Sequence, residues 1–209
     1  MARLMDLGMR QLRNMLLDMA SLSQRAVASS IRAYESGSTA KEVDSWADQL
    51  KLLHQQVSDL SIELIARYQP VASDLRFIKA CFEISYGFFR YGRYARDIAE
   101  VLTVFGDISK CDHGPVIEVA EVTTKMIGMS VEAFANRDVE LAKKITEMDD
   151  FVDSKYREHI RRVVSGGSQN IKCALSATLI LRYLERIADH ATYIGDSVVY
   201  IVTGKEPHG

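Results

Sequence analysis

Residues 89–100 read Phe-Arg-Tyr-Gly-Arg-Tyr-Ala-Arg-Asp-Ile-Ala-Glu, and 96 residues later residues 185–196 read Glu-Arg-Ile-Ala-Asp-His-Ala-Thr-Tyr-Ile-Gly-Asp. Arginine, alanine and isoleucine recur in place, small residues share the fourth and eleventh positions, and both segments end on an acid. Self-similarity at a fixed offset is typical of a chain built from repeated structural units. We therefore predict two copies of one three-helix unit, residues 1–108 and residues 109–209.

The regions around these segments have the pattern of long helices. No segment shows the alternation of β-branched and polar residues that is typical of a strand. Pro70 and Pro115 indicate breaks, because proline lacks a backbone donor and clashes with the preceding helical turn. Long helices with short connections pack as antiparallel bundles. The sequence predicts an all-α protein with six helices in two three-helix bundles: Leu4–Glu35, Thr39–Tyr68, Ser73–Val104, Pro115–Ala135, Asp138–Val164 and Ser168–Val202.

Two of the predicted helix starts carry capping signals. Thr39 stands three residues before Glu42, the spacing of a capping box in which each side chain accepts a hydrogen bond from the other residue's backbone. Asp138 precedes the fifth helix and can accept from its free amide groups.

The composition is that of an ordinary globular protein. The formal net charge is -2, whereas a general nucleic-acid binder would show a strongly basic domain. The N-terminus has no apolar core of a secretory signal, and no charge-free apolar segment is long enough to span a bilayer. Cys81, Cys111 and Cys173 lie far apart without CxxC spacing, so we expect neither a disulfide framework nor a zinc site. These features favour a reducing, cytoplasmic compartment.

Acidic residues follow one face of the sixth predicted helix. Glu185 and Asp189 stand four residues apart and project from the same side, with Asp196 on the same stripe, opposite the apolar arc that must face the core. Asp149 and Asp153 have the same spacing on the fifth helix. If the two helices are antiparallel neighbours, four carboxylates converge. Oxygen-rich clusters of this kind suit hard cations, or iron where carboxylates bridge metals.

The same stripe has a simpler interpretation as a solvated acidic face, since pairs of acids four residues apart are frequent. A ferritin-like oxidase is disfavoured, because the Glu-x-x-His pattern of the di-iron bundles is absent from these helices.

Three segments together resemble the PhoU family. The C-terminal segment 182–192, followed by Tyr200-Ile201-Val202-Thr203-Gly204-Lys205, is similar to the signature of that family. The segment Gln69–Ile78 resembles the opening of its third helix, and Met148–Asp153 with Tyr156 resembles its fifth-helix motif. The resemblance covers nearly the whole chain.

The resemblance implies a fold, a cofactor and partners. The two bundles would be related by a pseudo-two-fold axis and would carry a multinuclear metal cluster, commonly iron, on acidic pairs. The protein would restrain phosphate uptake by contacting the ATPase of a phosphate ABC transporter or a sensor kinase, as a homodimer without enzymatic activity. By this resemblance the C-terminal metal ligands would be Asp149, Asp153, Glu185 and Asp189, with Asp196 nearby.

The N-terminal half departs from the family pattern. Where the family has acids, this chain has Ala47 and Lys51 on the second helix and Phe89 and Arg93 on the third. We predict that Lys51 and Arg93 pair with acids such as Asp48, Asp97 or Glu100, and that this position holds no metal. An anion site is the alternative.

The sequence thus predicts a metal-binding regulator of phosphate uptake and signalling. Two other functions stay open: a carboxylate-bridged metal store or oxidase, and a helical adaptor for another transporter or channel.

Overall fold

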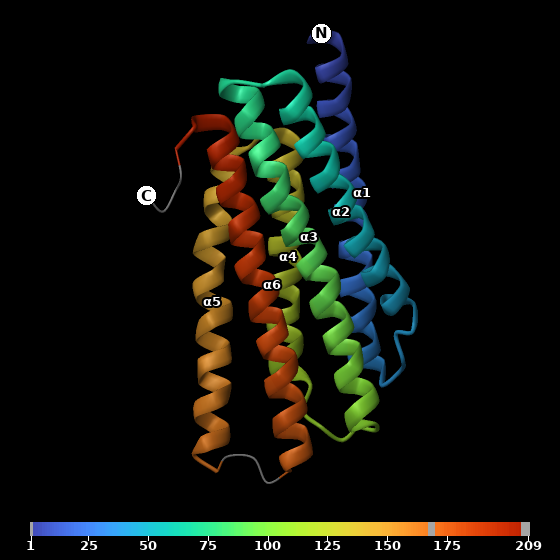
Figure 1. The fold of residues 1–209 in the computed structure, drawn as a ribbon. Coiled ribbons are helices and arrows are strands. Elements are labelled where there is room, and N and C mark those ends of the chain that lie inside the picture. The colour runs from blue at the N-terminus through green and yellow to red at the C-terminus, as the bar shows by residue number, and fades with distance from the viewer. Residues whose placement is uncertain (1, 167–169, 206–209) are drawn as a thin grey trace.

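The computed structural model describes residues 2–166 and 170–205, and its architecture is a bundle of six long helices (Figure 1). None of the described residues lies in a β-strand, which confirms the predicted all-α class. The helices are α1 (Ala2–Ser36), α2 (Glu42–Tyr68), α3 (Ala72–Phe105), α4 (Gly114–Asn136), α5 (Val139–Val164) and α6 (Ile171–Thr203).

The helix starts show where local signals decide and where packing decides. Asp138 caps α5 as predicted, because its Oδ1 accepts from the amide of Leu141 at 2.9 Å. The capping box at the start of α2 is wrong: the helix begins only at Glu42, after Lys41, whose side chain makes no cap. The carboxylate of Glu42 instead accepts a hydrogen bond from Ser29 of α1. Glu42 thus bonds to Ser29 of another helix and not to Thr39, its predicted partner in the capping box.

The described start of α6 differs from the predicted one. The predicted first residue, Ser168, lies outside the described residues. The helix is described from Ile171, and the side chain of Asn170 accepts from the amides of Lys172 and Cys173 at 3.0 and 3.3 Å. Asn170 is therefore the cap that satisfies two of the free donors at this end.

The contacts among the helices are symmetric: each contact in the N-terminal half has an equivalent in the C-terminal half. Helices α1, α2 and α3 all touch each other, as do α4, α5 and α6, and the halves meet through α3 with α6 and α1 with α4. Tyr94 and His190 occupy the same position of the sequence repeat, and their rings stack with centroids 6.0 Å apart. Equivalent residues contact each other where a two-fold axis passes between them. The pseudo-two-fold axis therefore passes close to this pair.

Helices α3 and α6 approach each other closely at Gly87, where the Ile194 side chain packs against the α3 backbone. A Cβ added at Gly87 would lie 2.8 Å from Cδ1 of Ile194, closer than real side chains come. One hydrophobic cluster runs through both halves and includes buried residues of every helix. The division into residues 1–108 and 109–209 stays a prediction. In the described part of the chain, no helix combines the length and the apolar character that a membrane span requires.

The cysteine prediction is wrong. Cys111 and Cys173 form a disulfide, with Cα atoms 5.4 Å apart and a sequence separation of 62, whereas Cys81 is free and buried. The reason is topological. Helices α4, α5 and α6 alternate in direction, so the starts of α4 and α6 lie at the same end of the molecule (Figure 1). Spacing along the sequence does not reveal that proximity.

The disulfide should contribute strongly to stability. In the chain-entropy model, closing a loop of this length stabilises the folded state by about 4 kcal/mol. We expect Cys111→Ser to lower the free energy of unfolding by that amount in denaturant titrations without reductant. With reductant present, variant and wild type should coincide. Equal stabilities without reductant would contradict the bond's contribution.

Candidate metal centre

The acidic residues of α5 and α6 converge where the two helices pack against each other. Asp153 lies on α5, and Glu185 and Asp189 lie one turn apart on α6. One carboxylate oxygen of each can be chosen so that all three lie within 4.8 Å of one another. Within residues 2–166 and 170–205, this is the one group of three such side chains that could hold a metal ion. The sequence predicted these three residues together.

The other two predicted ligands, Asp149 and Asp196, lie outside this group of three carboxylates. The carboxyl of Asp149, one turn before Asp153, interacts electrostatically with Asp153, Glu185 and Asp189, so it lies at the edge of the group. Its Oδ1 is buried and accepts no hydrogen bond. Asp196 lies two turns beyond Asp189 on α6 and is not part of the three-carboxylate group.

The acidic stripe is not a solvated surface. The side chain of Glu185 is 11% exposed, and those of Asp189 and Asp153 are 21% and 27% exposed. Oε2 of Glu185 is buried and accepts no hydrogen bond. Buried carboxylate oxygens without a donor are costly, because they have lost their hydration without compensation. The simpler interpretation of the stripe as a water-exposed face therefore does not hold.

Burial and mutual repulsion raise the pKa values of the cluster. Burial, followed by the charges of Asp189, Asp153 and Glu185, raises the pKa of Asp149 to about 6. Burial also raises the pKa values of Glu185 and Asp189, although arginines on α6 oppose the shift. Converging carboxylates favour the protonated form unless a cation compensates them. The cluster is thus prepared for a positive partner.

Three arginines already supply part of the compensating charge. Arg182 donates to Glu185 at 2.5 Å, and Arg186 donates to Asp189 at 3.1 Å. Arg157 of α5 donates to Asp153 at 2.5 Å. None of the three was predicted from the sequence, although each stands three or four positions from its acid, the spacing at which side chains on a helix meet. Nε of Arg186 stays 3.7 Å from the buried Oε2 of Glu185, beyond hydrogen-bonding distance.

The equivalent position in the N-terminal half holds ion pairs in place of a cluster of acids. Arg93 forms an ion pair with Asp97 at 3.1 Å, as predicted. A hydrogen bond from Arg96, and to a smaller degree the charge of Lys51, lower the pKa of Asp48. The ion-pair partner of Asp48 is Arg96, which was not predicted, and the pairing of Lys51 with an acid stays a prediction.

The remaining two substitutions of the N-terminal half fill space between helices. Ala47 is 4% exposed, and its Cα lies 3.6 Å from a Cβ added at Gly92 of α3. The ring of Phe89 stacks on His54 of α2, with centroids 5.7 Å apart and an interplanar angle of 7°. Packing and ion pairs thus occupy the place where the family pattern has acids.

Comparisons with known proteins show to which family the chain belongs. The family model of the PhoU domain matches residues 16–102 and 116–198, one segment in each half. The chain belongs to the PhoU family. It is 29% identical to the phosphate-specific transport system accessory protein PhoU homolog of Pseudomonas aeruginosa over 95% of this chain and 85% of the relative. It is 31% identical to PhoU homolog 1 of Methanothermobacter thermautotrophicus over 70% of this chain and 69% of that one.

Solved structures of this family have the same fold. The crystal structure of PhoU from Pseudomonas aeruginosa superposes with a TM-score of 0.91 at 27% identity, covering 96% of this chain and 99% of the other. The structure of the phosphate transport system regulatory protein PhoU from Streptococcus pneumoniae gives a TM-score of 0.85 at 20% identity. It covers 97% of this chain and 98% of that chain, and at this identity it shows the fold alone.

The raised pKa of Asp149 predicts how the metal-free PhoU fold responds to pH. A carboxyl whose pKa is higher in the folded state stabilises the fold below pH 4, and that stabilisation is lost as the pH rises through about 6. We expect Asp149→Asn to flatten this decline and to stabilise the metal-free protein at pH 7 by roughly 1 kcal/mol, after allowance for solvent screening.

The measurement is chemical denaturation of chelator-treated protein between pH 4 and pH 8. Asp150→Asn is the matched control, because it removes an exposed carboxyl one residue away. A decline that is as steep in Asp149→Asn as in the wild type would show that Asp149 is not the group responsible.

Proposed function

We propose that this chain is a metal-binding regulator of phosphate uptake and phosphate signalling, which acts through contacts with other proteins and has no catalytic activity of its own. One observation carries the proposal. Asp153, Glu185 and Asp189 bring carboxylate oxygens together in a largely buried place, and Glu185 and Asp149 each keep a buried oxygen without a donor. A protein that needed only rigidity would gain stability by losing these charges.

The donor set defines the kind of metal. Oxygen ligands alone suit hard cations such as Mg²⁺ and Ca²⁺, and bridging carboxylates suit iron. The family resemblance favours a multinuclear iron cluster. Asp153, Glu185 and Asp189 would form its centre and Asp149 its edge, and Asp196 would complete the site from the next turns of α6. Bound metal would supply the charge that the three arginines supply in part.

The names of the relatives support the role in phosphate uptake. The relatives in Pseudomonas aeruginosa and Methanothermobacter thermautotrophicus are named phosphate-specific transport system accessory proteins. For this chain we propose that the ATPase of a phosphate ABC transporter or a sensor kinase is the protein contacted. A cytoplasmic location, where both would be met, belongs to the proposal.

A homodimer is a further element of the proposal. Tyr86 on α3 and Tyr193 on α6 are 41% and 54% exposed, so part of the aromatic surface of these helices is open to a second copy. Sedimentation velocity at micromolar concentration distinguishes the monomer from the dimer.

The metal assignment has a direct test. We expect protein purified without chelator to carry metal, and Glu185→Ala/Asp189→Ala to carry less than a tenth as much. Two of the three central ligands are then gone, so the remaining carboxylates cannot hold a multidentate site. Metal per chain is measured by inductively coupled plasma mass spectrometry.

The control variant removes the same charge elsewhere. Asp44→Ala/Asp48→Ala deletes two acids of α2 that pair with Arg96, and it should leave the metal content unchanged. Full metal content in the α6 variant would refute the assignment. Equal loss in both variants would show that the effect is one of general charge.

The regulatory role is tested in cells that lack their own PhoU protein. We expect wild-type protein to lower the initial rate of radioactive phosphate uptake under high phosphate, and Glu185→Ala/Asp189→Ala to lose this effect at equal expression. Restraint that survives without metal would favour the helical adaptor. Dioxygen consumption by iron-loaded purified protein would favour the oxidase.

A further inference from the structure

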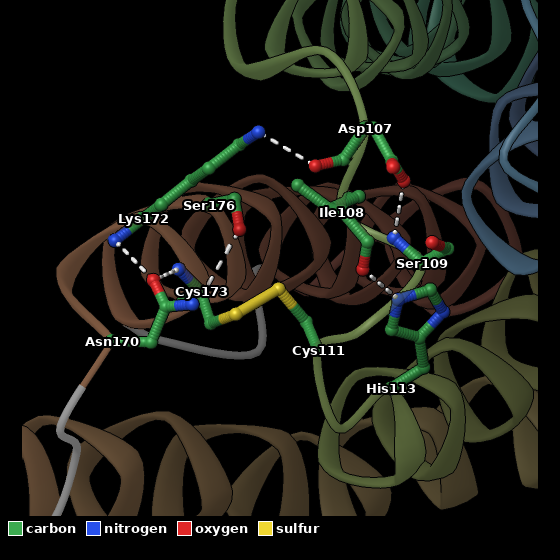
Figure 2. Close-up of a disulfide and its surroundings, with 9 residues drawn as sticks. All are labelled: Asp107, Ile108, Ser109, Cys111, His113, Asn170, Lys172, Cys173 and Ser176. Atoms are coloured by element: carbon green, nitrogen blue, oxygen red, sulfur yellow. Dashed lines mark hydrogen bonds between the residues drawn. A yellow bond between two sulfur atoms is a disulfide. The ribbon is translucent and has the colours of Figure 1, made fainter.

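The disulfide joins two segments that are 62 positions apart in the sequence. Cys111 lies in the connection 106–113 between the two halves, and Cys173 lies in the first turn of α6 (Figure 2). Both cysteines are partly exposed, unlike Cys81, which is fully buried in the core. Opening this bond requires movement of a surface connection rather than of packed helices. Such segments open at low free energy.

The first part of the connection is docked independently of the disulfide. Ile108 is 3% exposed and belongs to the core, and Nζ of Lys172 donates to the carbonyl of Asp107 at 2.6 Å (Figure 2). The amide of Cys111 donates to the carbonyl of Ile108 at 2.9 Å, a bond within the connection itself. The disulfide is therefore the link by which the second part of the connection is tied to α6.

The surroundings of Cys173 favour its release as a thiolate. It is the third residue of α6, where the helix dipole stabilises negative charge. Cys173 also lines a cavity of about 180 Å³ together with Arg162 and His159 of α5. Asp112 lines the same cavity as Arg162, so the support for a thiolate at Cys173 comes from its place in the first turn of α6. A thiol that is stabilised as thiolate leaves faster in disulfide exchange.

We infer that Cys111 and Cys173 form a reversible thiol–disulfide exchange site, which takes a dithiol reductant and whose reduction releases residues 109–113, the second part of the connection, from α6 while the helical bundle stays folded. The inference does not depend on the metal site or on the proposed function. The connection is the covalent link between the two halves, so the redox state would set how firmly the halves are joined at this end.

The exchange proceeds in two displacements. A thiolate of the dithiol attacks Sγ of Cys111, the bond between the two protein sulfurs breaks, and Cys173 departs with the electron pair as a thiolate. The second thiol of the reductant then loses its proton and attacks the mixed disulfide, which releases Cys111 as a thiolate. The dithiol is oxidised to its disulfide, and two electrons have passed to the protein. Oxidation by a disulfide reverses these steps.

Alkylation of the native protein tests the exchange. The folded chain is equilibrated with dithiothreitol, quenched and treated with N-ethylmaleimide, and the number of labels is read from the intact mass. We expect no label before reduction and two labels after it. Burial raises the pKa of the Cys81 thiol to about 12, so this residue should be labelled only after unfolding. Reduction that occurs only in denaturant would overturn the inference, because it would show an inaccessible structural bond.

Hydrogen exchange tests the conformational consequence. On reduction we expect amides of residues 109–113 and 170–176 to exchange at least tenfold faster, while peptides from α1 and α2 stay unchanged. Cys111→Ser and Cys173→Ser should both show the fast exchange in every redox buffer, whereas Cys81→Ala should respond like the wild type. Unchanged exchange in both segments after complete reduction, or acceleration throughout α1 and α2, would refute the proposed local release.

Discussion

The contact between α3 and α6 is the constraint on which the remaining structure depends. Gly87 allows the two helices to approach until Ile194 fills the space where a Cβ would lie, and Tyr94 stacks on His190 across the pseudo-two-fold axis. Helix α6 also packs against α4 and α5, so it is covered from three sides. Some of its positions stay exposed, such as Tyr193, but Glu185 and Asp189 lie where α6 faces a neighbouring helix. That neighbour is α5, which carries acids of its own.

The two halves have the same helix arrangement but carry different side chains at equivalent positions. At the offset of 96 residues, Phe89 and Arg93 stand where Glu185 and Asp189 stand in the other half. In the N-terminal half a ring stacks on His54 and a cation pairs with Asp97, so packing and an ion pair fill the positions of the two acids. In the C-terminal half, arginines pair with the acids but leave buried carboxylate oxygens without donors. The two halves thus share the arrangement of their helices and differ in the charges that these helices carry at equivalent positions.

The sequence was sufficient for features that repeat with the helical period or lie within one turn. It predicted the helices, the cap at Asp138, and the convergence of Asp153 with Glu185 and Asp189, because residues four apart share a face wherever the helix is placed. It failed at features that depend on which elements meet in space. Glu42 makes its hydrogen bond to another helix, and the bond between Cys111 and Cys173 joins segments 62 residues apart. The arginines of the acidic cluster had the right spacing and could have been found.

The positions of the disulfide and the acidic cluster on one helix have a physical consequence. Cys173 and Glu185 are 12 positions apart on α6, which corresponds to about 18 Å along the helix axis. At that distance exposed charges are screened by physiological salt, so the thiolate of Cys173 would not alter the electrostatics of the carboxylates directly. Any coupling between the two sites would be mechanical, through the seating of α6 against α5. Glu185 and Asp189 lie on α6 and Asp153 on α5, so sliding of these helices changes the distances between the carboxylates. The charge of Cys173 would thus not reach the carboxylates, but a movement of α6 would affect both sites because both lie on this helix.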